Sequence, residues 1–266
     1  MEGAFFDLDK TLLAGSSLFP LAREMYRQRY FTLSDIARLT ADQLWFRAIG
    51  TEEQGPMDRA RKASLEVIQG RKREDVLAFG RAVANKELVP RLYPQAVELM
   101  SRHKRVGRQV FIASSSPEDY LAILAEELGI DGVIGTRAEV VDGRYTGELD
   151  GPFVHGPEKA ARVAALAAER GIDVSRSYAY SDSINDLPLL ELVGNPVAMN
   201  PDRHLMQIAR KRGWQIIDLR IARRRTLMGS AVGGVAAAVG AAAYAAGYAM
   251  GRRSMARRSL REMVTT

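Results

Sequence analysis

The chain has 266 residues, of which 47% are apolar and 26% charged, an ordinary composition for a large globular domain or a core with a smaller insert. It contains no cysteine, which excludes disulfide bonds and thiolate metal sites, and its three scattered histidines argue against a histidine-built zinc site. The net charge of +6 comes from residues 220–266, which carry nine arginines and one acid, so the remaining 219 residues have a net charge of −2. This distribution argues against a body that binds nucleic acid.

The first predicted element is a short buried strand at residues 3–8, which is followed by a helical segment. From residue 16 to about residue 86, apolar side chains recur at helical spacing without the alternation of a strand. Helices are expected in this segment at residues 35–49, 56–69 and 73–86. We therefore expect residues 14–87 to form an all-helical insert.

From residue 88 onward, helices and strands alternate. Helices are predicted at residues 93–106, 117–128, 157–170, 184–193 and 202–212, and strands at residues 109–113, 132–135, 177–181, 196–199 and 214–217. The Asp142-Gly143 pair predicts a β-hairpin over residues 139–146. The alternation predicts an α/β fold with a doubly wound, largely parallel sheet, formed by residues 1–13 and 88–219.

Four polar clusters occur where they could meet at one edge of this sheet. Asp7 and Asp9 follow the first strand, where residues two apart can point to the same side. The other clusters are Ser114-Ser115-Ser116 after the second predicted strand, Lys159 at the start of a helix, and the run Asp182-Ser183-Ile184-Asn185-Asp186. Taken singly, these are ordinary helix caps or solvated side chains. Together they supply carboxylates for a metal, a hydroxyl, a cation and helix N-termini, the parts needed to hold a phosphoryl group.

These motifs, in this order, resemble those of the haloacid dehalogenase superfamily, in its phosphoserine-phosphatase-like branch (subfamily IB). The resemblance covers residues 4–217 and makes the helical insert similar to the family's C1 cap. It implies Asp7 as a nucleophile that becomes an aspartyl-phosphate, and Asp9 as the general acid and base. It also implies a Mg²⁺ ion, held by Asp7, the backbone carbonyl of Asp9, Asp182 and Asp186, and a phosphate site formed by Ser114, Lys159, Asn185 and Thr11.

The substrate is left open by a departure from that branch. Ser16 stands where phosphoserine phosphatases carry a glutamate that binds the substrate amine. The expected activity is therefore hydrolysis of a phosphomonoester, with phosphoserine, another small metabolite or a lipid phosphate as alternatives. A catalytically idle, membrane-anchored adaptor of the same fold, which only binds a partner, is the alternative from another class of function.

The C-terminal segment suggests membrane attachment. Residues 226–251 contain no charged side chain, and arginines flank both ends. As a helix, this segment is long enough to cross a hydrocarbon core of ~30 Å. Because these residues are mostly alanine and glycine, an interfacial helix or a flexible tail remains an alternative. The first residues lack the features of a signal peptide, so we expect a cytoplasmic catalytic domain tethered to the cell membrane. The sequence leaves the oligomeric state open.

Overall fold

The computed structural model of the chain describes residues 1–29 and 65–220. The chain divides into two units, Met1–Asp218 and Leu219–Thr266, and the first contains a six-stranded sheet with every neighbouring pair parallel. In spatial order its strands are β3 (Gly132–Thr136), β2 (Gln109–Pro117), β1 (Gly3–Phe6), β6 (Tyr178–Ser181), β7 (Asn195–Met199) and β8 (Gln215–Ile217). The predicted α/β fold with a parallel sheet is confirmed.

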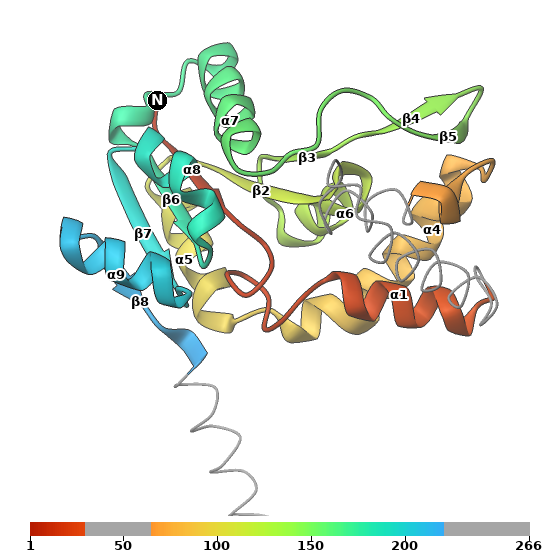
Figure 1. Cartoon of the computed structure of the whole chain (residues 1–266), viewed down its shortest axis with the longest axis horizontal. Coiled ribbons are helices and arrows are strands. Elements are labelled where there is room, and N and C mark those ends of the chain that lie inside the picture. The colour runs from red at the N-terminus through yellow and green to blue at the C-terminus, as the bar shows by residue number, and fades with distance from the viewer. Residues whose placement is uncertain (30–64, 221–266) are drawn as a thin grey trace, which may run out of the picture. The chain divides into compact units, whose positions relative to one another are not determined.

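The helices alternate with these strands along the chain (Figure 1). They are α1 (Leu18–Arg27), α4 (Arg73–Val83), α5 (Pro94–Arg105), α6 (Glu118–Leu128), α7 (Pro157–Arg170), α8 (Leu187–Leu192) and α9 (Arg203–Arg212). A π-helix (Ala84–Leu88) continues α4, and short 3-10 helices lie at Val89–Arg91, Val174–Arg176 and Ile184–Asp186. The predicted helix from residue 184 is thus divided, because Pro188 lacks an N–H and suits the first turn of α8.

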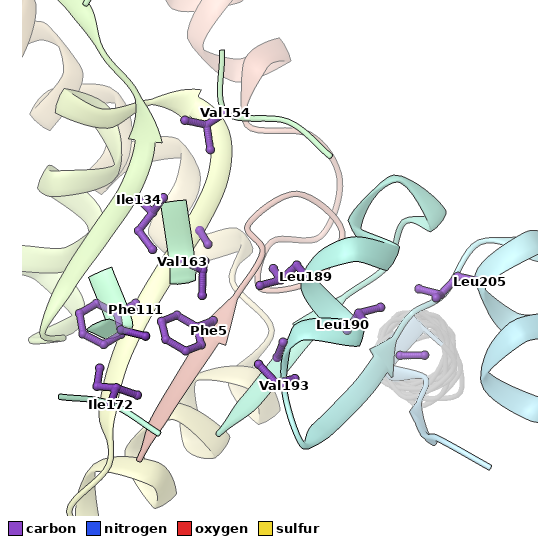
Figure 2. Packing of buried hydrophobic residues seen from close by; sticks show 14 of the residues in the cluster. Phe5, Phe111, Ile134, Val154, Val163, Ile172, Leu189, Leu190, Val193 and Leu205 are labelled. Atoms are coloured by element: carbon purple, nitrogen blue, oxygen red, sulfur yellow. The ribbon is translucent and has the colours of Figure 1, made fainter. Parts of the chain in front are cut away.

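Strand β1 is buried on both faces, as its unbroken apolar run predicts. Phe5 stacks on Phe111 of β2 with ring centroids 5.4 Å apart, and Val163 of α7 and Leu189 of α8 belong to the same core (Figure 2). The next side chain, Phe6, points to the other face and contacts His103 of α5 edge-on. Helices therefore cover both faces, which leaves the strand ends as the place where polar side chains can gather.

Strand β2 extends further than predicted. The sequence predicts a strand that ends at Ala113, whereas β2 continues to Pro117, which pairs with Thr136 of β3 after a shift of register. Pairing with the neighbouring strand thus overrides the weak strand preference of three serines. The serines form the irregular end of β2 and do not follow it.

The predicted hairpin is present as β4 (Ala138–Val141) and β5 (Arg144–Leu149). Its turn residues Asp142 and Gly143 both have positive φ angles, 49° and 73°, as a two-residue hairpin turn requires. The hairpin is also fastened to the chain that enters α4. The N–H of Gly70 donates to the carbonyl of Tyr145 at 2.8 Å, and the N–H of Tyr145 donates to the carbonyl of Arg71 at 3.1 Å.

Two predicted segments fall outside the described residues, the helix at 35–49 and the candidate span at 226–251. The helix predicted at 56–69 falls outside them for most of its length. Over residues 1–29 and 65–220, no helix combines the length and the apolarity needed to cross a bilayer.

Candidate active site

The carboxyl ends of three adjacent parallel strands bring the predicted motifs together. Asp7 directly follows β1, Ser114 lies near the end of β2, and Asp182 directly follows β6. The N–H of Asp7 donates to the carbonyl of Tyr180 at 2.9 Å, which holds the start of the loop against β6. The expectation that these clusters share one edge of the sheet is met.

The loop after β1 is anchored by apolar side chains. Leu8, Leu12 and Leu13 are fully buried, and the N–H groups of Leu12 and Leu13 both donate to the carbonyl of Leu8. Lys10 takes a left-handed conformation, with φ of 58°, and its carbonyl accepts a hydrogen bond from Nδ2 of Asn200 at 2.6 Å. Because the backbone is fixed on both sides, Asp7 and Asp9 are held in defined positions.

Lys159 joins two of the motifs through a buried ion-pair network. Its side chain, in the first turn of α7, is 2% exposed. The Nζ atom donates to Oδ1 of Asp7 at 2.9 Å and to Oδ2 of Asp186 at 2.8 Å. The Oγ atom of Ser181 also donates to Oδ2 of Asp186, at 2.7 Å. Asp186, the residue after Asn185, therefore contacts Lys159 directly.

The network has more negative charge than Lys159 neutralises. Burial raises the pKa of Asp7 to about 7, helped by the carboxylates of Asp186 and Asp182 and opposed by Lys159. Burial also raises the pKa of Asp182 to about 6, although Lys10 lies 3.8 Å away at the surface. Burial tends to lower the pKa of Lys159, but Asp7 and Asp186 outweigh it and raise that pKa above its ordinary value. The ammonium therefore stays protonated between two carboxylates, and the excess negative charge attracts a cation.

Asp9 has partners different from those of Asp7. Its Oδ1 accepts a hydrogen bond from the backbone N–H of Ser17 at 2.8 Å, and its Oδ2 accepts one from the Ser16 hydroxyl at 3.2 Å. The two carboxylates are neighbours in sequence, but one is held by a buried ammonium and the other by neutral donors. This asymmetry suits two different chemical roles.

Hydroxyl groups connect the end of β2 with the chain that enters α1. The Ser114 hydroxyl donates to the Ser116 hydroxyl at 3.3 Å, and the Ser116 hydroxyl lies 3.4 Å from that of Ser17. Ser115 lies 3.4 Å from Nδ1 of His155. Ser114 is a residue that the sequence predicts for the site, whereas Ser17 is not. The contact of Ser17 with Ser116 joins distant parts of the chain, so no local pattern in the sequence marks it.

The remaining candidate, Thr11, and one residue missed by the sequence reading both lie in this region. The Thr11 side chain is fully buried, and its hydroxyl has no hydrogen-bond partner among the described residues. Asp202 was not selected, yet its carboxylate accepts hydrogen bonds from the N–H groups of Ile184 and Leu205 at 2.9 and 2.8 Å. An aspartate before a helix is a local signal for the N-cap of α9. The hydrogen bond from Ile184, which holds the 182–186 loop, joins distant segments and has no such signal.

The atoms that carry the excess charge are carboxylate oxygens, which suit a hard cation such as Mg²⁺. Within residues 1–29 and 65–220, no three His, Cys, Asp or Glu side chains are grouped closely enough to hold a metal by themselves. A site at this edge would therefore combine carboxylates with a backbone carbonyl. The carboxylates of Asp7 and Asp182 and the carbonyl of Asp9, with Asp186 in support, are the ligands that the resemblance implies, and the raised pKa values of Asp7 and Asp182 fit a site that attracts a cation.

The chain is similar in sequence to proteins of a known family. Residues 4–191 match the haloacid dehalogenase-like hydrolase family. The chain is 39% identical over 226 residues to Phosphoserine phosphatase SerB1 of Mycobacterium tuberculosis (strain H37Rv), covering 85% of this chain and 73% of that protein. It is 31% identical to a histidinol-phosphatase of Neisseria meningitidis (serogroup C, strain 8013), covering 82% of this chain and 98% of that protein.

A solved structure is also similar. A protein with unknown function from Bordetella pertussis Tohama I superposes with a TM-score of 0.72 at 32% identity, covering 82% of this chain and 98% of that chain. The resemblance carried by the four motifs is thereby confirmed. The chain belongs to the haloacid dehalogenase-like hydrolases and is a hydrolase enzyme of the phosphoserine-phosphatase-like type.

Proposed function

We propose that the chain is a magnesium-dependent phosphomonoesterase that works through an aspartyl-phosphate on Asp7. The observation that carries the proposal is the pairing of a buried carboxylate, Asp7, with the Lys159 ammonium at 2.9 Å, next to a second carboxylate with separate partners. Asp7, Asp9, Lys159 and Asp182 are all present, which argues against the binding-only alternative.

The first step transfers the phosphoryl group to the protein. An oxygen of the Asp7 carboxylate attacks phosphorus, and the bond between phosphorus and the ester oxygen breaks. Asp9 donates its proton to that oxygen, so that the alcohol leaves neutral. The hydrogen bonds from Ser16 and the N–H of Ser17 keep the Asp9 carboxyl directed for this transfer.

The second step regenerates the enzyme. The Asp9 carboxylate takes a proton from a water molecule, whose oxygen attacks the phosphorus of the aspartyl-phosphate. The bond between phosphorus and the Asp7 oxygen breaks, and inorganic phosphate leaves. Lys159 and Ser114 bind non-bridging oxygens of the phosphoryl group, and Asn185 and Thr11 complete the phosphate site. The positive charge of Lys159 offsets the negative charge that develops on the phosphoryl oxygens.

Magnesium would be held by Asp7, the carbonyl of Asp9 and Asp182, with Asp186 in support. When bound, it neutralises charge on the phosphoryl oxygens and on Asp7. Release of inorganic phosphate from p-nitrophenyl phosphate should require added Mg²⁺, stop when EDTA is added, and return with excess Mg²⁺. Phosphate release that continues undiminished in EDTA would contradict the metal part of the proposal, and no release from any ester would contradict the proposal as a whole.

The substrate class is a small phosphorylated metabolite or a lipid phosphate. Support for a small metabolite comes from the relatives, which are named for phosphoserine and histidinol phosphate, two small polar monoesters. Support for a lipid phosphate comes from the uncharged segment 226–251, since a membrane tail would place the site beside such a substrate.

We further propose that residues 226–251 and the flanking arginines tether the catalytic unit to the cytoplasmic face of the cell membrane. The full-length protein should sediment with membranes, resist extraction by high salt, and dissolve in detergent. Extraction by salt alone would indicate electrostatic attachment to the surface. Recovery in the soluble fraction without salt or detergent would contradict the tether.

A further inference from the structure

The turn that joins β7 to α9 contacts two loops of the candidate site (Figure 1). It consists of Asn200, Pro201 and Asp202 and follows the carboxyl end of β7, the neighbour of β6 in the sheet. Asn200 is 1% exposed, and its N–H donates to the carbonyl of Ile217 at 2.7 Å. Pro201 is buried, and its ring restricts the backbone. The turn is therefore a fixed point at the sheet edge where the acids gather.

Asn200 anchors the loop that carries Asp7 and Asp9. Its Nδ2 atom donates to the carbonyl oxygen of Lys10 at 2.6 Å, and Lys10 directly follows Asp9 in the chain. The left-handed backbone of Lys10, with φ of 58°, is a conformation that costs free energy in a residue other than glycine. The hydrogen bond from Asn200 stabilises this conformation, and with it the orientation of the peptide that carries the Asp9 carbonyl.

Asp202 anchors the loop that carries Asp182. Its Oδ2 atom accepts a hydrogen bond from the N–H of Ile184 at 2.9 Å, and its own N–H donates to the carbonyl of Asp182 at 2.7 Å. Its other carboxylate oxygen, Oδ1, accepts from the N–H of Leu205 at 2.8 Å, which is the N-cap bond of α9. An N-cap needs only one acceptor oxygen, so the contact with Ile184 goes beyond what capping the helix requires.

We propose that this turn is a positioning element of the cation site, which fixes the separation of the two acid-bearing loops. The inference rests on the proposed function, in which Asp7, the carbonyl of Asp9 and Asp182 hold Mg²⁺. Because these ligands come from two loops, the distances between them depend on how the loops are held against each other. Asn200 and Asp202 act through the backbone of the loops and not by direct contact with the cation. Loss of such outer contacts typically weakens metal binding by about 10- to 100-fold.

Asp202→Ser separates the contact with the loop from the helix cap. Serine caps a helix about as well as aspartate, but it has one oxygen and cannot serve both Leu205 and Ile184. Isothermal titration calorimetry of the full-length protein with Mg²⁺ alone, without substrate, should give a Kd about tenfold above that of the wild type. Mg²⁺ should also raise the Tm of this variant by less than it raises the Tm of the wild type.

The control is Asp173→Ser, the same change at the exposed N-cap of the 3-10 helix Val174–Arg176. It should leave the Kd for Mg²⁺ as in the wild type. The ratio of the Kd values of Asp202→Ser and wild type should persist in high salt, which screens charges but does not alter hydrogen-bond geometry. A ratio that falls to one in high salt would assign the effect to the charge of Asp202 and overturn the proposal.

Asn200→Gly tests the other loop. Glycine adopts the φ of 51° found at this position without strain, and it removes the donor to Lys10. The Kd for Mg²⁺ should again rise about tenfold. The Tm in EDTA establishes that each variant is folded, and Asp202→Ser decides alone if Asn200→Gly is not. A fall of the Tm in EDTA with an unchanged Kd for Mg²⁺ would make the contacts of the turn structural only and overturn the proposal.

The assays also separate this proposal from the one on which it rests. Mg²⁺-dependent phosphate release by the wild type, combined with an unchanged Kd for Mg²⁺ in Asp202→Ser, would remove only the role of the turn. A wild-type protein that binds no Mg²⁺ and releases phosphate without it would remove both this role and the metal part of the proposed function.

Discussion

Asp7→Asn is expected to abolish phosphate release and to make the metal-free protein more stable above neutral pH. An amide cannot attack phosphorus as the carboxylate does, so kcat should fall by about 10⁴-fold or more. Its effect on stability follows from charge, since two buried carboxylates, Asp7 and Asp186, face the single ammonium of Lys159. Replacing one of them with an amide leaves a balanced pair.

The pH dependence of this stability has a definite sign. The pKa of Asp7 is about 7 in the folded protein, against 3.8 for the free side chain. A raised pKa means that the folded state favours the protonated acid. The contribution of protonated Asp7 to the stability of the fold is therefore fully present below pH 3.8 and is lost as the pH rises through about 7. The gain in unfolding free energy of Asp7→Asn should therefore grow between pH 4 and pH 8, to about 1–3 kcal/mol.

Denaturant unfolding at several pH values in EDTA measures this gain, because a bound cation would offset the charge of Asp7. The control is Asp142→Asn, the same chemical change on the exposed turn between β4 and β5. It should leave both activity and the pH profile of stability as in the wild type. An Asp7→Asn protein with wild-type kcat would remove Asp7 from the mechanism.

Lys159→Met is expected to cause the largest loss of stability. The substitution keeps the length of the side chain but leaves the carboxylates of Asp7 and Asp186 buried without their shared cation. Removing one partner from a buried ion pair costs about 3–5 kcal/mol. Phosphate release should also be lost, because a cation that binds the non-bridging oxygens is gone.

A second substitution separates charge from packing. Lys159→Met combined with Asp186→Asn should recover a large part of the lost stability, because one of the two facing carboxylates is then neutral. Lys211→Met, on the exposed face of α9, should change the unfolding free energy by less than about 0.5 kcal/mol. If the double variant is no more stable than Lys159→Met, loss of packing and not charge accounts for the effect.

The residues that meet at the candidate site could be predicted from the sequence because they are marked by residue types at short spacing. Asp7 and Asp9 are two residues apart at the end of an apolar strand, and the turn of the chain there follows from local geometry. Lys159 opens a helix whose start is marked by Pro157, again a local signal. The alternation of helices and strands then indicates the sheet edge where these residues meet.

Contacts between distant segments could not be predicted in this way. The contact between Lys159 and Asp186 is one example, because the direction of each side chain in the short 3-10 helix depends on how that helix packs. The extension of β2 through the serines likewise depends on β3, since pairing with a neighbouring strand outweighs local preference.

The sequence by itself determined the fold class, the family and the acids that follow the strands of the sheet, since periodicity and short motifs encode these locally. Only the tertiary structure decided how charge is distributed among Asp7, Lys159 and Asp186. Burial and pairing are properties of side chains brought together from distant parts of the chain. They set the pKa values of the buried acids and of the lysine between them.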